Sequence, residues 1–406
     1  MGLGIMSNVN YTIDDLHHMV NLGVRGNMVC DEIYKRLMPD VVDRYFNNLI
    51  AKGNPIDNKF YKHMKINDAK NHINIASNSI NKNEDWKEDY FEDWDIIIDD
   101  GLIQNKGYNY VYDTRGLRLL SSFNKHSRFP LYQPYFKPTN RISDYGILNS
   151  TGPVGFKVLN QRNFDDLKVC YTDKYADKDL TCVFVIVDIG KNSKVNLKEL
   201  FENKDGCKIY NILYLVRDGA TLKLNRQHDY NGKEQSMNII ESKFIQFPGS
   251  KLSYEVYGEG SKHNQEVIDL EIHDNCSTSI IGTFNLFDKN VNNMHVNVHH
   301  KKPGSTSIVD VRTIGDDFSH SSFCGKINID KIAEDTFAHL ENKNLMVSDS
   351  AVMITEPQLD INTKEVECSH GCTVSNFNKD MLYYLQSRGV DNIASEELLK
   401  ECFLKT

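Results

Sequence analysis

Short apolar runs of strand length follow one another from about residue 180 to residue 370, with no surviving helical period. Turn-forming sequences such as Phe247-Pro-Gly-Ser250 and Lys302-Pro-Gly-Ser305 separate these runs. Many runs alternate apolar and polar residues, as residues 252–257 do, which predicts one buried and one exposed face. A sandwich or barrel of this size would usually be divided by linkers, and no linker interrupts this region. We therefore predict a parallel β-helix, a stack of strand-built coils that grows by repeating one unit.

Helical periodicity precedes the strand-rich region. Ile33, Leu37 and Val41 recur every four residues within a helical pattern that runs from about residue 11 to residue 47. Such a stripe predicts an amphipathic helix, which Pro39 would kink or restart.

Helical spacing returns after the strands. Phe377, Met381 and Leu385 recur at intervals of four residues, and Gly389 is suited to end that helix. A second short helix is expected after Ser395, where acidic residues favour a first turn.

These patterns divide the chain into three predicted parts, of mainly β structure with flanking α structure. They are a helical or mixed region over residues 1–165, a parallel β-helix core over residues 166–374 and a helical region over residues 375–406. The stretch 99–164 gives no clear assignment. The open ends of a β-helix expose sheet edges, and flanking helices are suited to cover them.

Charge and motif content exclude several classes of function. The net charge is −9 with acidic and basic residues mixed along the chain, which argues against a nucleic-acid partner. No apolar run approaches the ~20 residues of a membrane span, and the first residues do not form a secretory signal, so we expect a soluble protein. Neither of the common glycine-rich phosphate-binding motifs occurs, so any nucleotide would have to be bound by a partner.

Cysteine and histidine usage leaves two questions open. The nine cysteines include no C-x-x-C pair, and most lie in apolar runs, which indicates reduced core thiols in a reducing compartment. His295, His299 and His300 cluster on one predicted strand, where His295 and His299 would share a face. This cluster is either a metal site or the polar outer face of a strand.

The most informative sequences lie between residues 344 and 403. They read Asn344-Leu-Met-Val-Ser348, Glu356-Pro-Gln-Leu-Asp-Ile361, Val366-Glu-Cys-Ser-His-Gly-Cys-Thr-Val374 and Leu382-Tyr-Tyr-Leu-Gln-Ser-Arg-Gly-Val390. This ordered series resembles the SufB/SufD family, and within it the SufD type. There a Pro-x-Leu-x-Ile strand leads to Cys-Ser-His-Gly-Ala-Thr and to a helix ending in Leu-x-Ser-Arg-Gly.

Two differences from the SufB type favour the SufD type. SufB-like proteins carry Glu-His-Glu-Ala-Thr where this chain has Ser369-His-Gly-Cys-Thr373. They also carry a cysteine in the strand before the proline, where this chain reads Asp349-Ser-Ala-Val-Met353. The chain departs from the SufD pattern at Cys372, which replaces Ala, and at Ser375, which replaces Gly.

The resemblance implies a right-handed parallel β-helix that acts as a non-catalytic scaffold in iron–sulfur cluster assembly. It implies a SufB-like partner, a SufC-like ATPase that binds ATP, and a transient cluster or iron shared with SufB. A homodimer is an alternative arrangement when the chain is alone. A divergent SufB-like subunit and a β-helix carbohydrate-active enzyme, for which Asp316-Asp317 is the best-placed acidic pair, are the competing functions.

The candidate site residues follow from the motif. Cys368 and His370 stand at i and i+2, so on a strand both side chains leave the same face and could bind one iron. Cys372 is a third candidate ligand. The alternative is a buried thiol beside a histidine that is bonded to the backbone.

The resemblance also implies that the C-terminal helices dock the ATPase, and that the protein is cytoplasmic in bacteria or located in a plastid-type organelle. The residues expected at that docking surface are Phe377, Met381, Leu385, Leu398 and Phe403.

Overall fold

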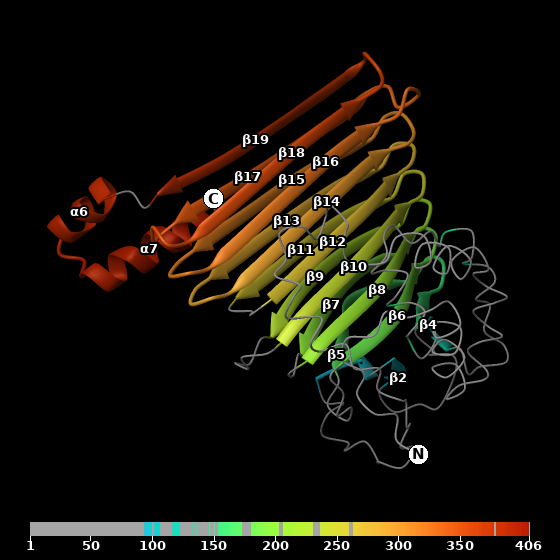
Figure 1. The fold of residues 1–406 in the computed structure, drawn as a ribbon. Coiled ribbons are helices and arrows are strands. Elements are labelled where there is room, and N and C mark those ends of the chain that lie inside the picture. Colours follow the sequence, from blue (N-terminus) through green and yellow to red (C-terminus); the bar gives the residue numbers. More distant parts are fainter. Residues whose placement is uncertain are drawn as a thin grey trace, which may run out of the picture.

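The computed structural model describes residues 93–99, 101–105, 116–121, 132, 135, 146, 150, 153–172, 180–202, 206–229, 236–259, 263–376 and 379–405. These residues form a parallel β-solenoid of about 7 turns, followed by two short helices (Figure 1). The predicted parallel β-helix is thereby confirmed. The helix predicted within residues 11–47 lies outside the described residues.

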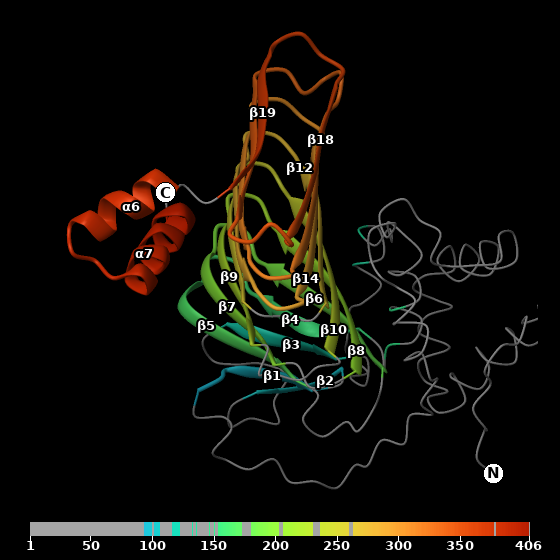
Figure 2. The same ribbon diagram turned by 60° about the vertical axis from the view of Figure 1, so that its left-hand side comes forward.

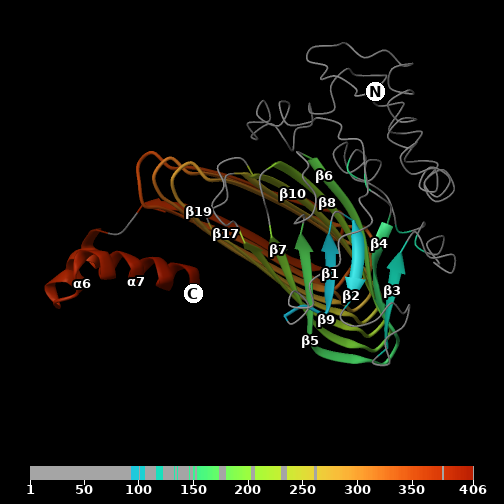
Figure 3. The same cartoon turned by 90° about the horizontal axis from the view of Figure 1, so that it is seen from below.

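Each turn of the solenoid adds one strand to each of two sheets. The first sheet, in spatial order, contains β19 (Val366–Asn376), β17 (Thr336–Met346), β15 (Thr306–Gly315), β13 (Ser277–Leu286), β11 (Lys251–Glu259), β9 (Thr221–Asp229), β7 (Lys194–Glu202), β5 (Asn163–Thr172), β1 (Ile96–Asp99) and β2 (Leu102–Asn105). The second contains β18 (Val352–Ile361), β16 (His320–Ile329), β14 (Val291–His300), β12 (His263–Ile272), β10 (Ser236–Gln246), β8 (Gly206–Val216), β6 (Leu180–Ile189), β4 (Pro153–Val158) and β3 (Leu117–Ser121). The described strands pair in parallel except β1 with β2 and β3 with β4, which lie at the N-terminal end of the stack (Figure 3).

The solenoid interior is filled by the inward-facing half of each alternating strand. Equivalent positions on five successive strands of the first sheet hold Leu224, Tyr254, Ile280, Val309 and Leu340. All five side chains are fully buried. Each turn therefore buries its apolar face against the next turn, which is how a repeat structure gains stability.

One corner of the solenoid repeats a tight turn that needs a left-handed residue. Asn275 and Gly304 occupy this position in successive turns, with φ of 54° and 73°. Their amides donate hydrogen bonds to the carbonyls of Pro303 and Glu334 in the following turn, at 3.1 and 3.0 Å. Glycine, asparagine and aspartate tolerate this conformation best, which explains the Pro-Gly and Asp-Asn pairs of the sequence.

Strands also form within residues 99–164, which periodicity left unassigned. β4 is buried along almost its whole length, so it lacks the alternation by which half-exposed strands are recognised. Tyr132 donates a hydrogen bond of 3.0 Å to the buried Asp188 of β6, and Arg217 pairs with the same carboxylate at 2.8 Å. These contacts hold Tyr132 against the first turns of the solenoid.

The two C-terminal helices are α6 (Lys379–Ser387) and α7 (Asn392–Lys405). Gly389 ends α6 with φ of 89°, as predicted. The predicted start of α7 after Ser395 is wrong, because the Asp391 carboxylate accepts the amide of Ala394 at 2.9 Å and caps the helix four residues before Ser395. No helix among the described residues is long and apolar enough to cross a membrane.

The helices lie beside the solenoid and do not extend its stack (Figure 2). α7 is attached to the outer face of the first sheet by a 3.0 Å hydrogen bond from Arg312 Nη1 to the carbonyl of Phe403. An ion pair of 3.6 Å joins Lys400 to Asp316 at the adjacent corner. The expectation that these helices cover the open sheet edges is therefore wrong for the described C-terminal part.

Candidate functional site

The last turn of the solenoid ends both sheets. β18 and β19 each pair with one described neighbour, β16 and β17, and no described strand lies on their other side. Their residues are exposed or half-buried, whereas earlier strands such as β13 bury every second residue. An unpaired strand edge is a template for pairing with another chain. This open end lies opposite the N-terminal strands in Figure 1.

β19 carries the three candidate ligands Cys368, His370 and Cys372. Their register places them beside Ala338, Leu340 and Asn342 of β17, which are buried in the solenoid interior. The three side chains therefore share the inward-facing side of β19, as expected from their spacing of two residues. His370 occupies the position that is fully buried in the five preceding strands of this sheet, where four of the five residues are aliphatic and the fifth is Tyr254.

The surroundings of the three side chains differ. Cys368 is half-buried and packs against the apolar core, and this burial raises the pKa of its thiol. His370 is exposed, and Cys372 is half-buried beside Asn342. Between them, the Ser369 hydroxyl points to the outer face and lies 2.8 Å from Nδ1 of His339.

The described residues alone do not assemble a closed metal site at this end. Within the described ranges, no group of three or more His, Cys, Asp and Glu side chains is placed to hold a metal ion. Neighbouring candidates on β19 are roughly 6.5–7 Å apart at the backbone, and Cys368 is roughly 13 Å from Cys372. One ion could therefore take at most His370 and one of the two cysteines of β19, and further ligands would have to come from outside the described residues.

The residues expected to dock the ATPase are partly accessible. Met381 is 55% exposed and Leu398 is 44% exposed, whereas Leu385 and Phe403 are half-buried. Phe377 lies outside the described residues. Further exposed apolar side chains on the two helices are Tyr383, Tyr384 and Ile393.

The histidine cluster of β14 does not form one site. His295 and His299 share the outer face, as expected, but they stand four residues apart along the strand. Nε2 of His299 lies 2.7 Å from Asp330. His300 faces inward between the hydroxyls of Ser305 and Ser307, at 2.7 and 2.8 Å, and its burial lowers the pKa to about 4. The polar outer face is the better description of His299, and His300 is a core residue.

The acidic pair Asp316–Asp317 belongs to a corner of the solenoid. The Asp317 carboxylate accepts the amide of Asp288 at 2.9 Å, and the Asp317 backbone has φ of 50°. Asp316 pairs with Lys400 of α7. Both carboxylates therefore take part in turn formation and helix attachment.

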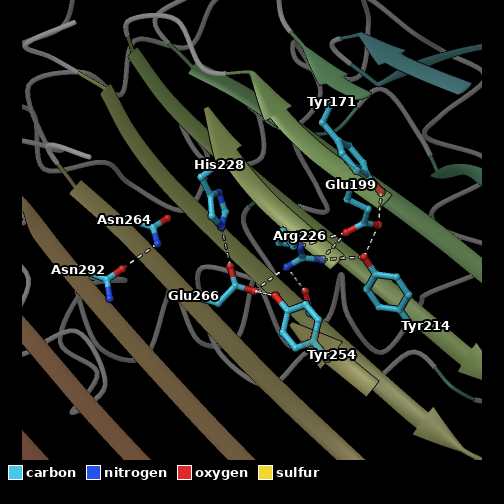
Figure 4. Close-up of polar contacts among 10 residues, drawn as sticks. Tyr171, Glu199, Tyr214, Arg226, His228, Tyr254, Asn264, Glu266 and Asn292 are labelled. Carbon is cyan, nitrogen blue, oxygen red and sulfur yellow. Dashed lines mark hydrogen bonds and ion pairs between the residues drawn. The ribbon is translucent and has the colours of Figure 1, made fainter. Parts of the chain in front are cut away.

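A charged network inside the solenoid was missed by the sequence analysis (Figure 4). Arg226 of β9 is completely buried and lies 2.9 Å from Glu199 of β7 and 2.5 Å from Glu266 of β12. Tyr214 donates a 2.6 Å hydrogen bond to Glu199, and Tyr254 donates a 2.7 Å bond to Glu266. The signal was present, because the inward positions 222, 224, 226 and 228 of β9 change from leucine to arginine and histidine.

The network sets the ionisation of its members. Burial alone would raise the pKa of Glu266, but the charge of Arg226, the nearby His228 and a hydrogen bond from Tyr254 bring it below its ordinary value. Burial lowers the pKa of His228, although Glu266, 3.6 Å away, opposes that shift. The network therefore favours charged Arg226 and Glu266 beside neutral His228.

Polar side chains continue from this network toward later turns. Asn238, Asn264 and Asn292 occupy equivalent inward positions on β10, β12 and β14, and all three are buried. Asn264 donates a 2.9 Å hydrogen bond to Asn292, which links adjacent turns (Figure 4). This bond favours the register in which the Asn264 and Asn292 amides face each other.

The fold and the open end define a class of protein: a parallel β-solenoid whose last turn presents unpaired strands with thiol and imidazole side chains. Residues 174–403 match the family described as "SUF system FeS cluster assembly, SufBD core domain". Because this match covers more than half of the chain, the chain belongs to the SufBD family.

Curated relatives include proteins named for the SufBD family and for SufD. The chain is 29% identical over 172 residues to the "Iron-sulfur cluster assembly SufBD family protein slr0076" of Synechocystis, covering 42% of this chain and 35% of that protein. It is 34% identical over 92 residues to "Iron-sulfur cluster assembly protein SufD" of Escherichia coli, covering 23% of this chain and 22% of that protein. It is 25% identical over 224 residues to "Protein ABCI7, chloroplastic" of Arabidopsis thaliana, covering 52% and 44%. The chain thus spans less than half the length of these relatives.

Proposed function

We propose that this chain is a SufD-like scaffold that pairs with a SufB-like subunit and docks a SufC-like ATPase during iron–sulfur cluster assembly. The observation that supports this most directly is the last turn of the solenoid. Its two strands are the Pro-x-Leu-x-Ile and Cys-Ser-His-Gly sequences that resemble SufD, and both end their sheets. In this proposal the chain performs no catalysis itself, and its partner binds ATP.

The SufB-like subunit pairs at the open end. A strand added beside β19 would satisfy its free backbone groups and would cover the half-buried Val366 of that strand. The same pairing would bring side chains of the partner next to His370. A chain without its partner would satisfy these edges by forming a homodimer.

The iron or cluster is cargo held for a time at that junction. His370 supplies an accessible imidazole, and one flanking cysteine supplies a thiol, a donor pair suited to iron. The partner subunit completes the coordination, because the described part of this chain offers too few ligands at this end.

The ATPase docks on α6 and α7. The two helices stand beside the solenoid and bury no apolar side chain of their own, so their exposed apolar residues remain accessible to a partner. The anchoring of α7 at Arg312 and Asp316 offers a route by which movement of the ATPase reaches the solenoid. We place the complex in a bacterial cytoplasm or a plastid-type organelle, in keeping with its cyanobacterial and chloroplast relatives.

Co-expression with SufB-like and SufC-like partners tests this function. We expect one stable complex, and we expect His370→Ala to leave its composition and ATP hydrolysis unchanged while its iron and sulfide content after anaerobic reconstitution falls sharply. His339→Ala is the matched control, since His339 lies on the outer face of the neighbouring strand. Failure to form the complex, or full cluster content in His370→Ala, would refute the proposal. Assembly with a SufD-like partner in place of a SufB-like one would identify the chain as a divergent SufB-like subunit.

A further inference from the structure

The two cysteines that flank His370 stand at the same distance from it in sequence, so spacing cannot choose between them. Cys368 pairs in register with Ala338, which is buried, and it packs against the apolar core together with Val366. A thiol in this position fills apolar space, as buried cysteines commonly do.

Cys372 lies next to buried asparagine side chains that hydrogen-bond to the neighbouring strands. It lies in register with Asn342, which is completely buried although it is polar. The Asn342 amide donates to the carbonyl of Val311 at 3.1 Å and accepts a 2.7 Å hydrogen bond from Asn344. Asn344 also donates to the carbonyl of Thr373 at 3.3 Å, directly after Cys372. These bonds tie β15, β17 and β19 together and hold the backbone at Cys372 in place.

Among the described residues, neither His370 nor Cys372 packs on the apolar core. Gly371 between them faces the outer side of β19, where a Cβ atom would meet only the Glu341 carboxylate, at 3.9 Å. His370 is exposed. An imidazole and a thiol at i and i+2 can thus approach one ion from a strand whose position is fixed by its neighbours.

From this geometry we infer that Cys372 is the partner of His370 in a half-site for a thiophilic divalent cation such as Fe²⁺ or Zn²⁺, and that Cys368 is a core thiol. This inference rests on the proposed function for the use of the site and extends it by choosing the ligand. Sulfur and imidazole donors select such borderline ions over Mg²⁺ or Ca²⁺. The remaining coordination positions are open to water or to a partner subunit.

Protection of the thiols from alkylation tests this inference on the full chain without partners. Cys368→Ser leaves Cys372 as the only cysteine of the 365–379 peptide, and Cys372→Ser leaves Cys368. Each variant is treated anaerobically with iodoacetamide over a series of Zn²⁺ concentrations, and alkylation of that peptide is followed by mass spectrometry. We expect Zn²⁺ to protect Cys372, and we expect no protection of Cys368 at the same concentrations. Adding His370→Ala should raise the Zn²⁺ concentration needed to protect Cys372 by at least about tenfold.

Two controls separate binding from altered folding. His339→Ala in the Cys368→Ser background should leave the protection of Cys372 unchanged, and Mg²⁺ should not replace Zn²⁺. Protection of Cys368, protection of neither thiol, or protection of Cys372 that survives His370→Ala would each overturn the inference. These outcomes are independent of complex formation. An assembled, cluster-bearing complex with unprotected Cys372 would therefore reject this ligand and keep the proposed function.

Discussion

Replacing Arg226 by methionine should destabilise the solenoid far more than removing any exposed charge. The Arg226 guanidinium is completely buried and contacts the carboxylates of Glu199 and Glu266 at 2.9 and 2.5 Å. Methionine keeps much of the volume but leaves both carboxyl groups in the interior without a cation. Removal of one partner from a buried ion pair costs about 3–5 kcal/mol of the free energy of unfolding. Tyr214 and Tyr254 would still donate to the two carboxylates, which favours the lower part of that range.

Urea unfolding followed by far-ultraviolet circular dichroism measures the effect as a lowered midpoint. Lys198→Met is the matched control, because Lys198 lies on β7 next to Glu199 and forms an exposed 2.8 Å ion pair with Asp166. An exposed pair of this kind contributes about 0.2–1 kcal/mol. Combining Arg226→Met with Glu199→Gln and Glu266→Gln should recover most of the loss, since no uncompensated charge then remains. Equal midpoints for Arg226→Met and Lys198→Met would refute the reasoning.

Three further predictions concern other parts of the chain. Truncation after Asn376 removes both helices and should abolish co-purification of the ATPase while the circular dichroism of the solenoid is retained; retained binding would place the contact elsewhere. Because burial lowers the pKa of His300 to about 4, the unfolded chain takes up this proton first, so stability should fall as the pH drops from about 6.5 towards 4. The difference between wild type and His300→Gln should follow that window, and a pH-independent difference would contradict it. Gly304→Ala should lower the free energy of unfolding by more than the roughly 1–2 kcal/mol of a left-handed alanine, because the new Cβ would clash with Asn275. Gly249→Ala should cost only that amount, because a Cβ there has room. Equal thermal midpoints for the two variants would contradict this prediction.

The parts of the fold that sequence could predict are those where alternation and turn chemistry coincide. β11 alternates exposed or half-buried with buried residues along its length, and it begins directly after the Pro248-Gly249 turn. The common face of Cys368 and His370 followed from strand periodicity alone. β4 escaped prediction because nearly all its residues are buried, which removes the period of two. The start of α7 was misplaced because Asp391, and not Ser395, supplies the capping oxygen.

Long-range polar contacts were beyond the reach of sequence patterns. Arg226 is 27 residues from Glu199 and 40 residues from Glu266, and only the stacking of turns brings them together. Isolated polar residues at inward positions were the available sign, but a single strand cannot show which partner satisfies them. Sequence patterns could not choose between Cys368 and Cys372 for the same reason, because that choice depends on their neighbours Ala338 and Asn342 in the preceding turn.

At the last turn of the solenoid, the described strands β18 and β19 each have one unpaired edge. In the five strands from β9 to β17, the inward position in register with His370 is fully buried, ending with Leu340. Among the described residues no further turn covers the imidazole at this position, and α6 and α7 lie to the side. The two terminal strands are not equivalent templates, because Pro357 interrupts the donors of β18, whereas β19 contains no proline. Strand addition should therefore be more continuous along β19, the strand that carries His370 and Cys372. A partner that completes this sheet would at the same time bring ligands to the metal, so stable pairing and metal coordination would depend on the same edge.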